Sequence, residues 1–174
     1  MTYRKILITV SIFIIVCGCK SGDSVSSQPT VEEPKHLASI VRANDTAVSS
    51  QLLNGFGAIE AQSWRWTAPH FTVALGVPPG ADKNGASLVL AFTLPEISIK
   101  NLKSFTVSAK AGDAVLAPQT YEKAGAQTYM RDIPASAFKS EALQVQFDVD
   151  KFLQQPGDKR QLSLIVTSIQ LEPK

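Results

Sequence analysis

The strongest constraint on the fold is an alternation of apolar and polar residues near the C-terminal end of the chain. Residues 143–150 read LQVQFDVD, so apolar side chains occupy every second position without exception. Successive side chains of a β-strand point to opposite faces. A period of two therefore predicts a strand with one face in a core and the other in water.

Further strand-like segments follow one another from residue 64 onward. Residues 86–94 are apolar at nearly every position, as in a strand that is buried on both faces. In residues 162–171 the inward set changes phase between Val166 and Ile169, which predicts a β-bulge. The expected strands are 64–66, 70–77, 86–94, 104–110, 114–117, 128–133, 143–150 and 162–171.

These segments predict the fold class. Seven to nine short strands, separated by Gly- and Pro-containing turns such as residues 78–85, are typical of a β-sandwich. Strands do not alternate with long amphipathic helices, which disfavours a Rossmann-like fold. We therefore expect an all-β protein with a single β-sandwich of jelly-roll topology over residues 52–174, a normal length for one domain.

The N-terminal residues predict export. Arg4 and Lys5 precede an apolar run at residues 6–16, and this order is typical of a signal peptide. A membrane-spanning helix needs roughly 20 apolar residues, so an uncleaved anchor helix is the less favoured alternative. We expect residues 1–18 to be a signal peptide.

The end of this run, Val16-Cys17-Gly18-Cys19, resembles a bacterial lipobox. The resemblance implies cleavage before Cys19 and its lipidation on the sulfur and on the new amino group, and several acyl chains anchor a protein stably to a membrane. It also implies a location in the cell envelope. Lys20 stands where an inner-membrane retention signal usually has Asp, which favours the outer membrane if the host has one. Cys17 would be removed with the signal peptide and Cys19 would be lipidated, so no cysteine remains for a disulfide.

Residues 19–51 are expected to form a flexible tether behind the lipidated cysteine. They are rich in Ser, Pro, Glu and Asp, a composition that cannot bury enough apolar surface to offset its chain entropy. Within the tether, residues 36–42 could form a short helix or a strand. The chain has 17 Lys and Arg against 15 Asp and Glu, and removal of Arg4 and Lys5 leaves no net charge. We expect no nucleic-acid partner, because phosphate backbones require a basic surface.

The residue inventory argues against an enzyme. His36 and His70 are the two histidines, which disfavours a zinc site, and the sequence has no Gly-x-Ser-x-Gly turn. We expect His70 on the surface or on an edge strand. Asp148 and Asp150 lie on one face of one strand and are interpreted as a solvated face, since paired catalytic carboxylates must face each other across a cleft. We expect no catalytic residue, no metal and no cofactor.

A first candidate binding cluster surrounds the two tryptophans. Trp64 and Trp66 should share one face of an extended segment, either packed in the core or forming a platform on which a sugar ring stacks. Glu60 and Arg65 would either supply hydrogen bonds to that ligand or pair with each other.

A second candidate cluster comprises Tyr121, Tyr129 and Arg131. Tyr129 and Arg131 are two positions apart and should lie on one face of a strand. They are interpreted either as a second ligand-binding group or as ordinary surface residues.

A resemblance to a known family rests on several stretches of the domain: Gly55-Phe56, Glu60, Trp64-Arg65-Trp66-Thr67, Ile133-Pro134-Ala135, residues 160–164 and Ile169-Gln170-Leu171. Together they resemble galactose-binding-like β-sandwich modules. The resemblance implies a β-sandwich, and it implies sugar binding through Glu60 and residues 64–66. We therefore expect a lipid-anchored, non-enzymatic envelope protein that binds carbohydrate or another envelope component. The alternative is a structural or assembly lipoprotein that holds a protein partner through a sheet face or edge.

The lipobox interpretation can be tested directly. Growth of expressing bacteria with radiolabelled palmitate should label the protein, and Cys19→Ala should abolish the label because that sulfur is the acceptor. Continued labelling of the variant would contradict lipidation at Cys19.

Overall fold

The computed structural model describes residues 36–174. The expected signal peptide, the lipidated Cys19 and the tether before residue 36 lie outside the described residues. Within residues 36–174, no helix is both long enough and apolar enough to cross a membrane.

The described residues form nine strands and four short helices. The strands are β1 (Ile40–Arg42), β2 (Leu52–Glu60), β3 (Trp64–Gly76), β4 (Ala86–Leu94), β5 (Phe105–Ala111), β6 (Ala114–Tyr121), β7 (Gly125–Ile133), β8 (Ala142–Val149) and β9 (Ile165–Pro173). The α-helices are α1 (Ala81–Asn84) and α2 (Glu96–Leu102), and the 3-10 helices are η1 (Thr46–Gln51) and η2 (Ala135–Ala137).

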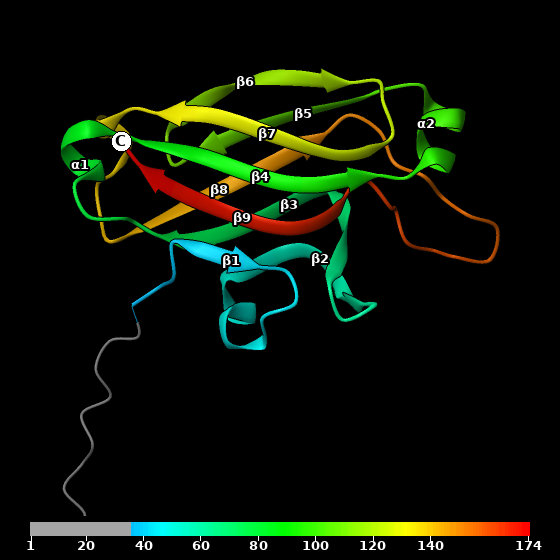
Figure 1. The fold of residues 1–174 in the computed structure, drawn as a ribbon, viewed down its shortest axis with the longest axis horizontal. Helices are drawn as coiled ribbons and strands as arrows, with labels where there is room; N and C mark the ends of the chain where they lie inside the picture. Colours follow the sequence, from blue (N-terminus) through cyan, green and yellow to red (C-terminus); the bar gives the residue numbers. More distant parts are fainter. Residues whose placement is uncertain (1–35) are drawn as a thin grey trace, which may run out of the picture. The chain divides into compact units, whose positions relative to one another are not determined.

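The strands form two layers joined into one continuous antiparallel ladder. Their hydrogen-bonded order is β6-β5-β8-β3-β9-β4-β7, with β1 added to β9 and β2 added to β3. In Figure 1 the layer of β9, β4 and β7 lies across the layer of β3, β8 and β5. Aromatic contacts join the layers: Phe147 on β8 meets Tyr129 on β7, and Phe92 on β4 meets Tyr121 on β6. The predicted all-β fold with a single β-sandwich is confirmed.

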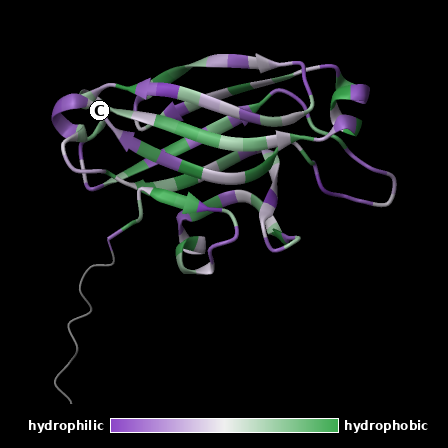
Figure 2. Cartoon of the chain, viewed as in Figure 1, coloured by the Kyte–Doolittle hydropathy of each residue, from purple (hydrophilic) through white to green (hydrophobic). Residues whose placement is uncertain are grey.

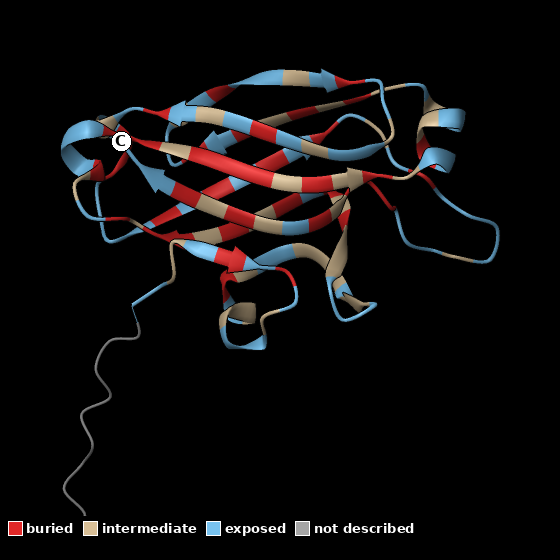
Figure 3. Cartoon of the chain, in the orientation of Figure 1, coloured by how far each residue is buried: buried red, intermediate tan, exposed pale blue. Residues whose placement is uncertain are grey.

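Burial follows the alternation that predicted the strands. In β8, every second residue from Leu143 to Val149 is buried and the intervening residues are exposed. β5 alternates in a similar way between buried and more exposed residues, and Figures 2 and 3 show both kinds of residue along the strands of the sandwich. β4 departs from it as expected: it lies between β7 and β9, and six of its nine residues are buried.

The core between the layers is rich in aromatic rings. Phe71 on β3 stacks on Phe147 on β8, with ring centroids 4.8 Å apart and an interplanar angle of 12°. Such a pair contributes about 0.5–1.5 kcal/mol beyond the area that it buries. The largest fully buried side chains are Tyr129, Phe71, Phe92, Phe105, Phe147, Leu75, Leu88, Leu90, Leu94, Ile133, Leu164 and Ile169.

The predicted β-bulge in the last strand is confirmed. Ala91 of β4 pairs with Ser168 and its neighbour Phe92 pairs with Val166, so Thr167 is the extra residue. The Thr167 hydroxyl donates a hydrogen bond to the Ala91 carbonyl, and the Thr167 carbonyl accepts one from the amide of Ala43. The bulge thus supports the segment that follows β1.

The sandwich begins before residue 52, which corrects the predicted tether boundary. Residues 40–42 form strand β1 on β9 rather than a helix, and Val41 is 1% exposed. Leu37 packs against Gly76 so closely that a Cβ atom there would lie 1.9 Å from the Leu37 carbonyl oxygen. Residues 36–51 are therefore part of the folded domain.

Gln51 fastens this segment to the sandwich. Its buried side-chain amide donates hydrogen bonds to the carbonyls of Ala38 (2.9 Å) and Ala74 (2.7 Å), and its Oε1 accepts one from the Ala38 amide (2.9 Å). The side chain thus bridges the N-terminal segment to β3, where no strand ladder joins them. A buried glutamine with these hydrogen bonds is inconsistent with a flexible tether at residue 51.

Replacement of Gln51 tests this attachment. Gln51→Met keeps the length of the side chain but removes the acceptor of the part-buried Ala38 amide and a donor to the carbonyls of Ala38 and Ala74, so the free energy of unfolding should fall by about 2 kcal/mol. Denaturant unfolding of the full-length protein measures the change, with Gln144→Met on the exposed face of β8 as the control. An unchanged midpoint for Gln51→Met would contradict the attachment.

Candidate functional site

The candidate site is built on the hairpin of β2 and β3. The hairpin turns at residues 61–63, where Ala61 and Gln62 have positive φ angles. The register of β2 on β3 shifts at Asn54 and Phe56. Gly55 makes this possible: its φ is +78°, and a Cβ atom would lie 2.2 Å from the carbonyl oxygen of His70. β2 thus crosses very close to β3 at that point.

The two tryptophans lie on one face of β3, as predicted. The rings of Trp64 and Trp66 meet edge to face, with centroids 6.0 Å apart and an interplanar angle of 88°. Both residues are half-buried. This result falls between the two interpretations of the sequence, because the rings neither belong to the core nor stand free in water.

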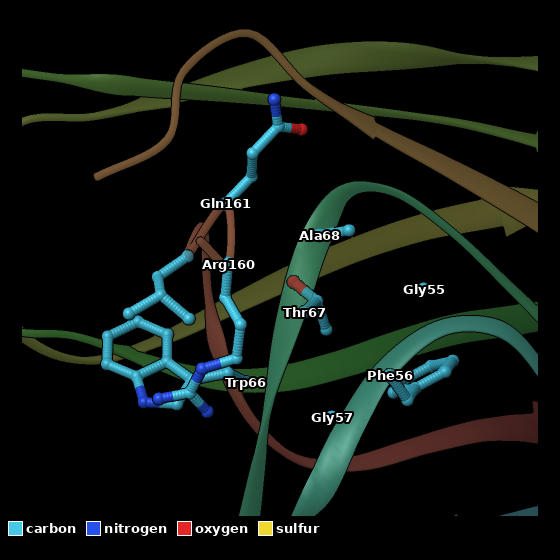
Figure 4. A pocket seen from close by; sticks show the side chains of 9 residues that line it. Gly55, Phe56, Gly57, Trp66, Thr67, Ala68, Arg160 and Gln161 are labelled. Carbon is cyan, nitrogen blue, oxygen red and sulfur yellow. The ribbon is translucent and has the colours of Figure 1, made fainter. Parts of the chain in front are cut away.

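A hollow of about 250 Å³, the Trp66 hollow, lies beside this pair. Figure 4 shows Trp66 and Arg160 on one side of it, with Phe56 and Gly57 on the opposite side. Its wall is mainly apolar, and Arg160 and Gln161 supply polar groups from the connection between β8 and β9. The hollow therefore combines an aromatic face with hydrogen-bonding groups.

Arg160 is held in place by two carboxylates. Its guanidinium donates to Glu60 Oε1 at 2.8 Å and to Asp158 Oδ2 at 2.8 Å. Hydrogen bonds from Arg160 lower the pKa of Asp158 below its ordinary value, and the same contacts raise the pKa of Arg160. Glu60 therefore pairs with Arg160 and not with Arg65, which corrects the expected pair.

Arg65 does not belong to the hollow. Its guanidinium donates to the carbonyls of Ala43 (2.7 Å) and Gly57 (2.9 Å) and to the hydroxyl of Ser49 (3.3 Å). These contacts attach η1 and the segment after β1 to the hairpin. Arg65 is therefore a structural residue, and the expectation that it binds ligand is not supported by its position.

The side chains of the second predicted cluster make structural contacts between β6 and β7. Tyr129 is fully buried, and its hydroxyl donates to the carbonyl of Ala117 at 2.9 Å. The Arg131 guanidinium lies 4.7 Å from the centre of the Tyr129 ring and also donates to the Ala117 carbonyl at 2.8 Å. The hydroxyl of Tyr121, which is buried too, donates to the carbonyl of Thr128. Burial raises the pKa of Tyr121 to about 12.

These contacts join β6 to β7, two neighbouring strands that do not share a hydrogen-bonded ladder. We call this junction the β6–β7 seam. Tyr129 cannot reach a ligand because no part of it is exposed, so its predicted role is wrong.

His70 and the two aspartates lie on the outer face of the second layer. His70 is exposed but sits on β3, between β2 and β8, and not on an edge strand. Its Nδ1 is hydrogen-bonded to Asp148 Oδ1, while Asp150 Oδ1 accepts a hydrogen bond from the Thr106 amide at 2.7 Å. Both aspartates are exposed, as expected. Across residues 36–174 no group of three or more acidic, His or Cys side chains could hold a metal ion.

Sequence reasoning missed Arg160 and Gln161 as site residues. They follow a Pro-Gly turn at residues 156–157, and the sequence around them contains no aromatic residue that would indicate a sugar-binding site. Glu60, to which Arg160 is bound, lies 100 residues earlier. Only the packing of the connection against the hairpin brings them together.

Tryptophan fluorescence should report on the hollow, because both tryptophans of the chain lie beside it. Arg160→Ala should increase acrylamide quenching by uncovering Trp66, while the midpoint of denaturant unfolding should stay close to that of the wild type, because solvent-exposed ion pairs contribute little to stability. The full-length protein with Lys159→Ala is the control. Quenching that stays at the wild-type value would contradict the position of Arg160 beside Trp66 in the hollow.

No protein-family model matches the chain, and no curated protein matches it in sequence. Solved structures of CBM domains are similar to it in fold. The CBM36-1 domain of a multidomain xylanase from the hindgut metagenome of Trinervitermes trinervoides is 10% identical, with 78% of this chain and 96% of that chain covered and a TM-score of 0.43. A CBM4 structure is 14% identical, with 78% and 85% covered and a TM-score of 0.34. Similarities this distant carry no argument about the site.

Proposed function

We propose that the protein is a lipid-anchored, non-enzymatic envelope protein whose β-sandwich binds carbohydrate at the Trp66 hollow. One observation carries the binding proposal: Trp66, half-buried and in edge-to-face contact with Trp64, lines a hollow together with the guanidinium-bearing Arg160. The lipobox-like sequence that ends at Cys19 supports the anchor and the envelope location.

The chemistry of a sugar ring fits this arrangement. One face of a pyranose ring exposes C–H groups that pack on an aromatic surface, and its edge carries hydroxyl groups that need hydrogen-bond partners. Trp66 supplies the surface, and Arg160 supplies N–H donors. The contacts with Glu60 and Asp158 fix Arg160 before a ligand arrives, which lowers the ordering cost of binding.

The size of the hollow sets the scale of what it can enclose. Pockets that hold drug-sized ligands measure about 300–1,000 Å³. A hollow of about 250 Å³ is smaller than that range and suits a single ring rather than a large ligand. The wall is formed mainly by apolar atoms and backbone, so most of the binding free energy would come from stacking.

A second candidate function, binding of a protein partner, has its own observation. Val115 is 82% exposed and Met130 is 51% exposed, and both border an open hollow at the β6–β7 seam. Exposed apolar patches can mark contact surfaces. However, Pro118 lacks an N–H group and Arg131 occupies neighbouring carbonyls, so the edge of β6 is poorly suited to pair with a further strand.

A glycan array tests the carbohydrate proposal. The full-length protein, kept in a detergent without a sugar headgroup, should retain a defined class of glycans. Trp66→Ala should weaken that binding by about tenfold, because stacking on an aromatic ring contributes on the order of 1 kcal/mol.

Met130→Ala, on the seam, is the matched control and should bind as the wild type does. Denaturant unfolding of both variants verifies that they remain folded. An array that retains no glycan, or equal losses in both variants, would count against carbohydrate binding at Trp66 and favour the protein-partner alternative.

A further inference from the structure

A second hollow lies next to the first, on the outer face of the layer formed by β3, β8 and β5. We call it the His70 hollow; it is open and has a volume of about 500 Å³. Three outward side chains are aligned across the three strands: His70 pairs with Asp148, and Asp148 pairs with Ser108. The hollow therefore rests on a rigid sheet rather than on loops alone.

The His70 hollow presents hydrogen-bonding groups around one aromatic ring. Asp148 and Asp150 each use Oδ1 in a contact within the protein, and for neither Oδ2 do the described residues supply a partner. Ser108 adds a hydroxyl group, and Phe152, 37% exposed, adds a ring at the end of β8. An aromatic face with acceptors and hydroxyls around it repeats the chemistry of the Trp66 hollow.

The two hollows are adjacent. Gln161 lines both. Thr67 and Ala68 line the first, and the next residues of the same strand, Pro69 and His70, line the second. In Figure 4 the side chain of Gln161 extends away from Trp66, on the other side of the connection between β8 and β9. A ligand longer than one ring could therefore contact both hollows past Gln161.

The charge of this surface limits the ligand. Among the described residues that line the His70 hollow there are two aspartates and one histidine but no Lys or Arg. In the Trp66 hollow, the charge of Arg160 is already offset by Glu60 and Asp158. An anionic sugar would thus meet carboxylates without a free cation, and like charges brought together are unfavourable.

We propose that the two hollows are consecutive subsites for one linear, uncharged glycan chain, and that this surface rejects acidic glycans. The inference rests on the proposed function, since it names the class of carbohydrate for the same site. Trp66 stacks one ring, Gln161 lies between the subsites, and Phe152 with Asp148 contacts a ring further along the chain.

Binding measurements against glycan length and charge test the inference. The full-length protein in sugar-free detergent is titrated with disaccharides and hexasaccharides of cellulose, xylan, mannan and chitin, and with a galacturonan hexasaccharide. At least one neutral hexasaccharide should bind about tenfold more tightly than its disaccharide, a difference typical of one further stacked ring. The galacturonan should bind more weakly than the neutral chains.

Two variants locate the second subsite. Phe152→Ala should lower the affinity for the hexasaccharide to that for the disaccharide and leave the disaccharide affinity unchanged. Asp148→Lys replaces a negative charge by a positive one, so it should improve galacturonan binding by about tenfold while weakening the neutral hexasaccharide. Met130→Ala serves as the control, and unfolding curves establish that each variant is folded.

The outcomes separate the two proposals. Equal affinity for disaccharide and hexasaccharide, or no effect of Phe152→Ala, would overturn the second subsite and leave sugar binding at Trp66 intact. Stronger binding of galacturonan than of neutral chains by the wild type would overturn the proposed rejection of acidic glycans. Absence of binding to every probe, together with an empty glycan array, would overturn the proposed function itself and this inference with it.

Discussion

The two layers and both hollows depend on one long strand, β3, which pairs with different strands along its length. β3 pairs with β2 along one side, while on the other side residues 65–66 pair with β9 and residues 70–76 pair with β8. The change occurs around Pro69, which has no N–H group to offer a ladder. Because β9 and β8 belong to different layers, β3 holds the two layers together. Both hollows border this change of partner, with tryptophans before it and His70 after it.

The connection between β8 and β9 is the second element that both hollows need, and short contacts fix its two ends. Leu153 and Leu162 form an isolated antiparallel bridge. The amide of Ser163 donates to the carbonyl of Thr67, and its hydroxyl donates to the carbonyl of Lys151. Arg160 and Gln161 therefore sit on a loop whose base is attached to β3. Such an attachment gives a surface site the fixed geometry that recognition of sugar hydroxyls requires.

Features that neighbouring residues determine could be predicted from the sequence, whereas features that depend on contacts between distant residues could not. The alternation in β8 and the phase change near Thr167 are properties of neighbouring residues, and both were predicted correctly. Strand β1 has three residues and is held by its pairing with the distant β9, so the local sequence left helix and strand open as alternatives. Tyr129 was grouped with Arg131 because the two residues share a strand face, yet a hydrogen bond from its hydroxyl to the Ala117 carbonyl lets the ring lie in the core. The pairing of Glu60 with Arg160 joins distant parts of the chain, and composition cannot choose between two arginines.

This surface would distinguish neutral from acidic glycans by the cost of desolvating a ligand carboxylate, rather than by attraction between net charges. A carboxylate on a ligand would lose water and find no unpaired cation among the described lining residues, whereas a hydroxyl group can donate to Asp148 or Asp150 at little cost. A neutral ring also loses less hydration when it stacks on Trp66 or Phe152. The same carboxylates that make the sheet face look like an ordinary solvated surface in the sequence can therefore act as selective acceptors, provided that aromatic rings lie beside them. Phe152 supplies such a ring beside Asp148 and Asp150, because it follows them closely in the connection after β8.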